Sequence, residues 1–209
     1  ANSSAQNLGL SKQAAMEAAS TFGNLFISMG MGKAPAAAMS QSLLTLAADL
    51  ASFNNIPVDE ALLKLRSGLI GEAEPLRSLG VLLTEDTMKA QAMTMGLKCV
   101  NGVLTEGEKV QARYALILKQ TATAQGDFAN TSEGLANKQR IQAAEMKNLS
   151  AQIGGKLLPV QLLATDALMG MVRGIVQFGD SLGKPMAILE SFGIALGGAF
   201  GGDAEKWLT

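Results

Sequence analysis

The residues of this chain that could carry out acid–base chemistry are few, and their spacing builds no recognisable site. Glu72 and Glu74 are carboxylates separated by a single residue. Glycoside hydrolysis needs two carboxyl groups about 5–9 Å apart, held in a cleft and in different environments. Nothing in the surrounding pattern builds such a cleft, whereas Pro75 follows Glu74 directly and Arg77 lies close by. A local ion pair or a helix cap is therefore the better interpretation.

Other common catalytic and binding chemistries lack the residues that they need. The chain contains no histidine, which removes Ser-His-Asp triads and metal–histidine sites. Without a histidine to activate it, Cys99 is expected to be a buried structural thiol. The glycine-rich stretch 193–202 lacks the Lys-Ser or Lys-Thr pair of a phosphate-binding loop, and the 11 methionines are expected to fill the core. The sequence predicts no enzyme, no cofactor and no metal site.

Composition and charge exclude two further classes of protein and favour a helical one. The formal net charge is -1, so electrostatic capture of DNA is not supported. With 48% apolar and 17% charged residues, the chain does not have the composition of a disordered protein. Leucine and alanine dominate over valine and isoleucine, a bias typical of helices rather than strands. The polar start after Ala1 carries no signal-peptide pattern, and we expect the chain to be part of a longer protein.

Periodic apolar residues predict an all-α fold of multiple helices joined by glycine and proline turns. Helices are expected over residues 11–29, 36–53, 58–69, 84–97 and 105–124, with irregular stretches over 70–83 and 126–130 and a longer helix from 131 or 132 to beyond 152. Ser11, Thr84 and Thr105 are good N-caps, and Glu108 completes a capping box with Thr105. The predicted architecture is a helical bundle or an extended helical assembly.

The longest predicted helix carries a pattern close to a heptad repeat. Its repeating positions, three and four residues apart, are Leu135, Gln139, Gln142, Met146, Leu149 and Ile153. One interpretation is a short coiled coil in which the two glutamine layers set the register. The other is an amphipathic helix that packs on a neighbouring helix. The sequence leaves both interpretations open.

The last quarter of the chain is apolar and rich in glycine, and we interpret residues 153–209 as a segment distinct from residues 1–152. Glycines spaced by four residues are expected to lie on one helix face and to allow close helix packing, at Gly170 and Gly174 and at Gly193, Gly197 and Gly201. Two stretches, 157–178 and 186–200, approach a membrane span, but both contain charged residues. A tightly packed helical hairpin and a segment that inserts conditionally into a membrane both remain open.

Two blocks of sequence resemble a known family. Residues 68–81 are GLIGEAEPLRSLGV, and residues 124–137 are AQGDFANTSEGLAN. In this order they resemble the conserved core region of the tail tape-measure proteins of long-tailed bacteriophages and prophages. The most specific parts are Glu74-Pro75-Leu76-Arg77 and Gly126-Asp127-Phe128, and the resemblance extends over residues 8–165.

The resemblance implies a mechanical role as a structural protein of the virion. Proteins of this family are long, largely helical chains in the lumen of the tail tube, and tube subunits polymerise around them until their length is used up. The implied partners are other copies of the chain, the tail-tube protein, tail assembly chaperones and tail-tip proteins, with a host membrane at genome ejection. The implied location is the tail lumen of the virion, and the host cytoplasm during assembly.

The resemblance implies that the length of the chain sets the length of the tail tube. An α-helix rises 1.5 Å per residue, so 209 helical residues would span about 310 Å and could set the length of the tail tube. The apolar stretch 157–200 would assist the passage of DNA through the host envelope. The alternative is a membrane-active, pore-forming or holin-like helical protein.

Two groups of residues in the blocks are expected to have structural roles. Glu74, Pro75 and Arg77 are expected to fix a turn that joins two helices. Gly126 is expected to lie in the turn before the long helix, and Asp127 and Thr131 to cap that helix.

Overall fold

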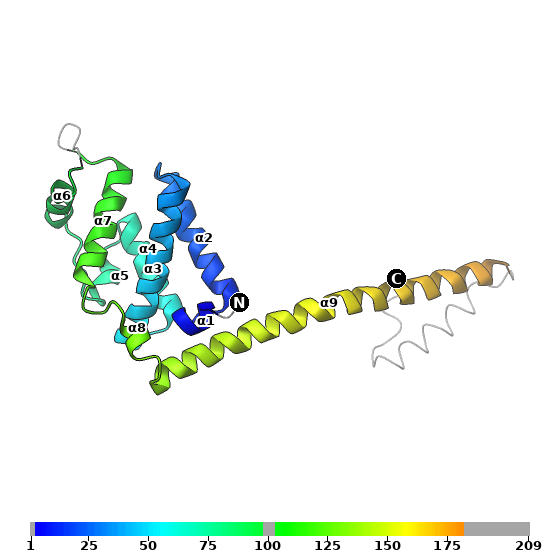
Figure 1. The fold of residues 1–209 in the computed structure, drawn as a ribbon. Helices are drawn as coiled ribbons and strands as arrows, with labels where there is room; N and C mark the ends of the chain where they lie inside the picture. Colours follow the sequence, from blue (N-terminus) through cyan, green and yellow to red (C-terminus); the bar gives the residue numbers. More distant parts are fainter. Residues whose placement is uncertain (1–2, 98–102, 182–209) are drawn as a thin grey trace. The chain divides into compact units, whose positions relative to one another are not determined.

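The chain is all-α, as the sequence predicts (Figure 1). The computed structural model describes residues 3–97 and 103–181, and the chain divides into two compact units, residues 1–150 and 151–209. The helices in the described residues are α1 (Ser3–Leu8), α2 (Lys12–Ser28), α3 (Lys33–Phe53), α4 (Val58–Ile70), α5 (Glu74–Arg77), α6 (Glu85–Thr94), α7 (Glu106–Gln120), α8 (Asp127–Asn130) and α9 (Leu135–Ser181). No strand occurs in this part of the chain.

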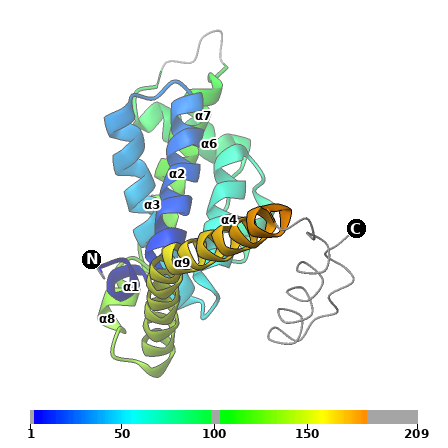
Figure 2. The same cartoon turned by 90° about the vertical axis from the view of Figure 1, so that its right-hand side faces the viewer.

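Helix α3 is the centre of the first unit. It packs against α1, α2, α4 and α8, and both views show α2 running beside it (Figures 1 and 2). Between positions 43 and 51 only Thr45 is exposed, because neighbours cover α3 on nearly every side. Other large buried side chains of the same apolar core come from α2, α4, α7 and α8: Phe22, Phe26, Leu65, Leu69, Val110, Ile117 and Phe128. Alanines such as Ala47, Ala48 and Ala51 let these helices approach closely.

The predicted caps position the helices of this unit. The Ser11 hydroxyl accepts a hydrogen bond from the Ala14 N–H at 3.2 Å at the start of α2. At the start of α7 the Thr105 N–H donates to the Glu108 carboxylate at 2.8 Å, and the Glu108 N–H donates to the Thr105 hydroxyl at 3.3 Å. The Thr105 hydroxyl also donates to the Glu108 carboxylate at 2.7 Å, and this bond together with the one from the Thr105 N–H lowers the pKa of the Glu108 carboxyl below its ordinary value. The predicted capping box is therefore confirmed.

The stretch predicted to be irregular, residues 70–83, contains the one-turn helix α5. Helix α4 ends at Gly71, whose φ of 110° is in the left-handed region that favours glycine. Pro75 lies in the first turn of α5, and Arg77 Nη1 pairs with Glu74 Oε2 at 2.8 Å, so the predicted local ion pair is present. The turn between α4 and α6 is thus built around a short helix, whose Leu76 side chain is fully buried.

Helix α9 begins later than the expected long helix and, as expected, continues beyond residue 152. It begins at Leu135 rather than at residue 131 or 132, and it continues without a break past the predicted segment boundary at 152/153 to Ser181. Its interior includes Gly154, Gly155 and Pro159. In the described part of the chain, no helix combines the length and apolarity that a membrane crossing requires. The second half of the predicted hairpin, with Gly193, Gly197 and Gly201, lies outside the described residues.

A close contact between α4 and α5 makes Gly68 a test of this packing. A Cβ at Gly68 would collide with Leu76 Cδ1, and Leu76 is fully buried and cannot withdraw. We expect Gly68→Ala to lower the free energy of unfolding by about 1–3 kcal/mol, although helix propensity alone favours alanine. Urea denaturation measures the change. Gly23→Ala in α2 is the matched control, because its nearest neighbour, Ser40 Oγ, would be 3.7 Å away. Equal stability of the two variants would contradict the packing.

Candidate functional site: the docked base of the long helix

A buried carboxylate of α3 organises the segment that precedes α9. Asp49 is 4% exposed, and its two oxygens accept hydrogen bonds from the Gly126 N–H at 2.9 Å and from the Phe128 N–H at 3.1 Å. These are backbone donors at the start of α8 that have no partner within their own short helix. Gly126 adopts a φ of 85°, which turns the chain so that both N–H groups face Asp49. By binding these N–H groups, Asp49 positions α8 so that the Phe128 side chain packs in the core.

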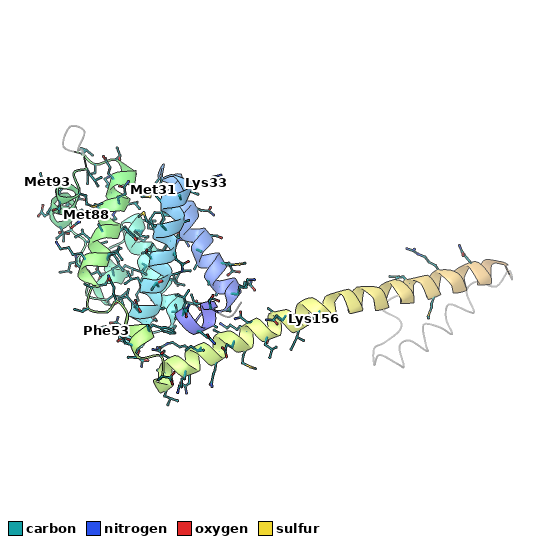
Figure 3. All side chains as sticks on the ribbon, in the orientation of Figure 1. Met31, Lys33, Phe53, Met88, Met93 and Lys156 are labelled. Carbon is teal, nitrogen blue, oxygen red and sulfur yellow. The ribbon has the colours of Figure 1, made fainter. Side chains whose placement is uncertain are left out.

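The beginning of α9 is joined to α3 and α8 by side-chain hydrogen bonds. Asn137 is 3% exposed, and its amide donates to the Ser52 hydroxyl at 2.8 Å and to the Thr131 hydroxyl at 2.9 Å. The Thr131 hydroxyl donates to the Asp127 carbonyl one turn earlier, at 2.6 Å. Ser52 lies near the end of α3, which Phe53 marks in Figure 3.

The expectation that Asp127 and Thr131 cap the long helix is wrong. Asp127 is the first residue of α8 and Thr131 is its C-cap, four residues before α9 begins. A one-turn helix lies where only a turn was expected, because Asp49 supplies partners for its N–H groups from another helix. Thr131 instead acts as a hydrogen-bonding bridge between α8 and Asn137.

Arg140 holds α9 on the turn between α3 and α4. Its guanidinium donates to the carbonyls of Ala51 and Ile56 at 3.3 Å and to the Asn55 side-chain oxygen at 3.1 Å. A cation at this place also complements the partial negative charge at the C-terminal end of α3. Its other nitrogen donates to Asn137 Oδ1 at 2.7 Å, which couples the two docking residues.

Two turns farther along, α9 meets the start of α2. The Asn148 side-chain oxygen accepts a hydrogen bond from the Lys12 N–H at 2.7 Å, so α9 supplies a partner for a backbone donor at the N-terminus of α2. The side chains that α9 turns toward the first unit share one face, and we call this the docked face: Asn137, Arg140, Ile141, Ala144 and Asn148. Asn137, Arg140 and Asn148 of the docked face make hydrogen bonds to the first unit, and Ile141 and Ala144 add apolar side chains.

The apolar side chains at the base of α9 lie on its exposed surface. Leu135 is 75% exposed, Met146 is 63% exposed, and Leu149 and Ile153 are each 50% exposed. An amphipathic helix on a folded unit normally buries its apolar stripe and exposes its polar face. Here the large apolar side chains at the heptad positions are exposed instead, so within the described residues they do not pack on a neighbouring helix.

A local ion pair lies beside this joint. Lys138 Nζ pairs with Glu133 Oε2 at 2.8 Å, and this contact lowers the pKa of the Glu133 carboxyl. Over the ranges that the structure describes, no cluster of histidine, cysteine and carboxylate side chains could hold a metal ion. The hydrogen bonds of the joint connect the base of α9 to α2, α3 and α8.

The structure brings together some of the sequence-predicted residues and separates others. Gly126, Asp127 and Thr131 meet at the joint, whereas Glu74, Pro75 and Arg77 form α5. Gly170 and Gly174 are exposed, and no described atom lies within 4 Å of a Cβ built on either.

Sequence reasoning missed four residues that make the joint. These are Asp49, Asn137, Arg140 and Asn148. Asn137 is the last residue of the second sequence block, which was a signal for its role. Asp49 had a different signal, because a charged side chain in an otherwise apolar helix is rarely buried without partners.

Removal of the Asp49 carboxylate should destabilise the first unit. Asp49→Ala leaves two N–H groups of α8 without acceptors, one of them buried, so we expect the free energy of unfolding to fall by about 2–4 kcal/mol. Chemical denaturation measures this. Asp86→Ala, at an exposed position of α6, is the control and should change stability by less than about 1 kcal/mol. An Asp49→Ala protein as stable as the control would refute the role given to this carboxylate.

Loss of Arg140 should release the base of α9 without unfolding α3. We expect Arg140→Ala to speed amide hydrogen exchange over residues 135–148 at least about tenfold, because four hydrogen bonds disappear. Exchange in α3 should stay slow. Lys147→Ala, at an exposed position of the same helix, is the matched control. Equal exchange in the two variants would show that the guanidinium does not hold the helix.

No protein-family model matches the chain, and no match to it was found among the curated proteins or the solved structures.

Proposed function

We propose that this chain is part of a tail tape-measure protein, a structural protein of the virion that sets the length of a tail tube. The observation that carries the proposal is α9, a continuous helix of 47 residues whose base is docked by hydrogen bonds to a folded helical unit. At 1.5 Å per residue, α9 is about 70 Å long. A helix of this length converts residue number into distance, which is what a ruler requires.

The positions of the two sequence blocks support the proposal. The first block, residues 68–81, covers the end of α4 and all of α5, where Gly68 allows close packing and Gly71 turns the chain. The second block, residues 124–137, covers α8 and the entry into α9. Both blocks lie at junctions whose geometry demands particular residues. The resemblance is thus concentrated where the fold is most restrictive.

The length expectation needs one correction. Helices α1 to α8 pack against one another within the first unit, so their residues do not each add 1.5 Å to an extended rod. The estimate of about 310 Å for the whole chain is therefore wrong, and the proportional length applies to α9 alone. Changes in tail length should follow changes in α9 and not changes in the first unit.

A deletion within α9 tests the proposal. Removal of residues 160–177 from the parent tail protein takes out five helical turns and leaves the docked face intact, so we expect tails about 27 Å shorter by electron microscopy. Replacement of the same residues by an unrelated helical sequence of equal length is the control and should leave tail length unchanged. Tails of normal length after the deletion, assembled in normal number, would contradict the proposal that α9 sets the tail length.

A protein with this function would contact several partners. Other copies of the chain, the tail-tube protein, assembly chaperones and tail-tip proteins would contact it in the host cytoplasm during assembly and then in the tail lumen. At infection, the glycine-rich segment after residue 153 would assist DNA passage through the host envelope. The length test also separates this proposal from a pore-forming or holin-like protein, for which tail length would not depend on α9.

A further inference from the structure

We propose that α9 contains a hinge, residues 154–159, at which the helix bends while its docked base stays fixed on the first unit. We call these residues the hinge segment; their sequence is GGKLLP, and they lie in the interior of α9. Lys156, which is labelled in Figure 3, lies within this segment. Such a hinge is independent of the proposed function, because it follows from the composition and the surroundings of this helix alone.

The hinge segment combines the two residue types that are least favourable inside a helix, glycine and proline. Gly154 and Gly155 have no Cβ, so their backbone loses more conformational freedom than that of other residues when it is held in a helix. Pro159 has no N–H group, and the carbonyl of Gly155, four residues earlier, therefore lacks its usual donor in the helix. All three residues lie within about two helical turns, and sharp bends in helices are found almost always at such positions.

The surroundings of the hinge segment give these glycines no packing role. In the first unit, Gly68 is required by close packing, because a Cβ there would collide with Leu76. By contrast, no described atom lies within 4 Å of a Cβ built on Gly154 or Gly155. Residues 151–156 are all exposed, so tertiary packing gives this part of the helix little support. Close approach to a described neighbour thus explains neither glycine, whereas a need to bend explains both.

The hinge segment follows the part of α9 that is docked. The docked face ends at Asn148, which accepts a hydrogen bond from the Lys12 N–H, and the first compact unit ends at residue 150. Before this point, α9 is also held by the hydrogen bonds of Asn137 and Arg140. A sideways load on the part of α9 beyond residue 159 therefore bends the weaker hinge segment before it breaks the bonds of the docked face.

A bend at these residues changes the direction of α9 but not the number of residues in it. The disturbance caused by glycine and proline is local, so the helical turns on either side keep their rise of about 1.5 Å per residue. The hinge thus separates two properties of the helix. Its base is fixed by side-chain hydrogen bonds, and its far part is free to change direction.

Distances between two spin labels that bracket the hinge segment test the proposal. In a Cys99→Ser background, which removes the only native cysteine, the labels are attached at Lys147→Cys and Met169→Cys, two exposed positions of α9. A straight helix would separate these positions by about 33 Å. In double electron–electron resonance of the full chain, diluted with unlabelled protein, we expect a broad distribution that extends to shorter distances.

A stiffened hinge segment is the decisive variant. Gly154→Ala, Gly155→Ala and Pro159→Ala together restore a helix-favouring sequence, so we expect the distribution to narrow at least about twofold around the straight-helix distance. Gly170→Ala with Gly174→Ala is the matched control, because it removes two exposed glycines of the same helix beyond the labels, and the distribution should stay broad. Equally narrow distributions with and without the stiffening substitutions, or equal narrowing by the control, would overturn the hinge.

Discussion

The packing of this chain depends on one constraint, that backbone polar groups removed from water at helix ends must find partners. The ends of α2, α3 and α8 meet near one place, and side chains from other helices supply their partners. Asp49 accepts from two N–H groups of α8, Arg140 donates to two carbonyls around the end of α3, and Asn148 accepts from the start of α2. These contacts explain why buried charge and amide groups occur in an otherwise apolar fold, since each replaces bonds that water would have made.

The same constraint explains why the large apolar side chains at the base of α9 do not face the folded unit. A helix that must satisfy the ends of three others needs polar side chains toward them, so Asn137, Arg140 and Asn148 occupy the docked face. The apolar heptad positions are consequently turned outward. The docked face thus fixes the base of α9 on the folded unit.

Local signals in the sequence predicted the starts of α2, α4, α6 and α7 to within one residue, but they did not predict the short helices α1, α5 and α8. Ser11 and the capping box of Thr105 and Glu108 work through bonds between residues three apart, so the sequence around them contains the whole interaction. The ion pair of Glu74 and Arg77 is equally local. The predictions for Asp127 and Thr131 were wrong because the conformation of this segment depends on Asp49 of α3, which is distant in sequence and accepts hydrogen bonds from the N–H groups of Gly126 and Phe128.

By itself, the sequence determined that the chain is helical, where α2, α4, α6 and α7 begin, and that α9 carries a heptad pattern, because spacing and capping are short-range properties. Only the tertiary structure decided which face of α9 is covered and which is exposed. That choice depends on Asp49, Arg140 and Asn148, whose partners lie more than 75 residues away in the chain. Periodicity shows that a helix has two faces, but the energy of satisfying polar groups on a neighbouring surface decides which one is buried.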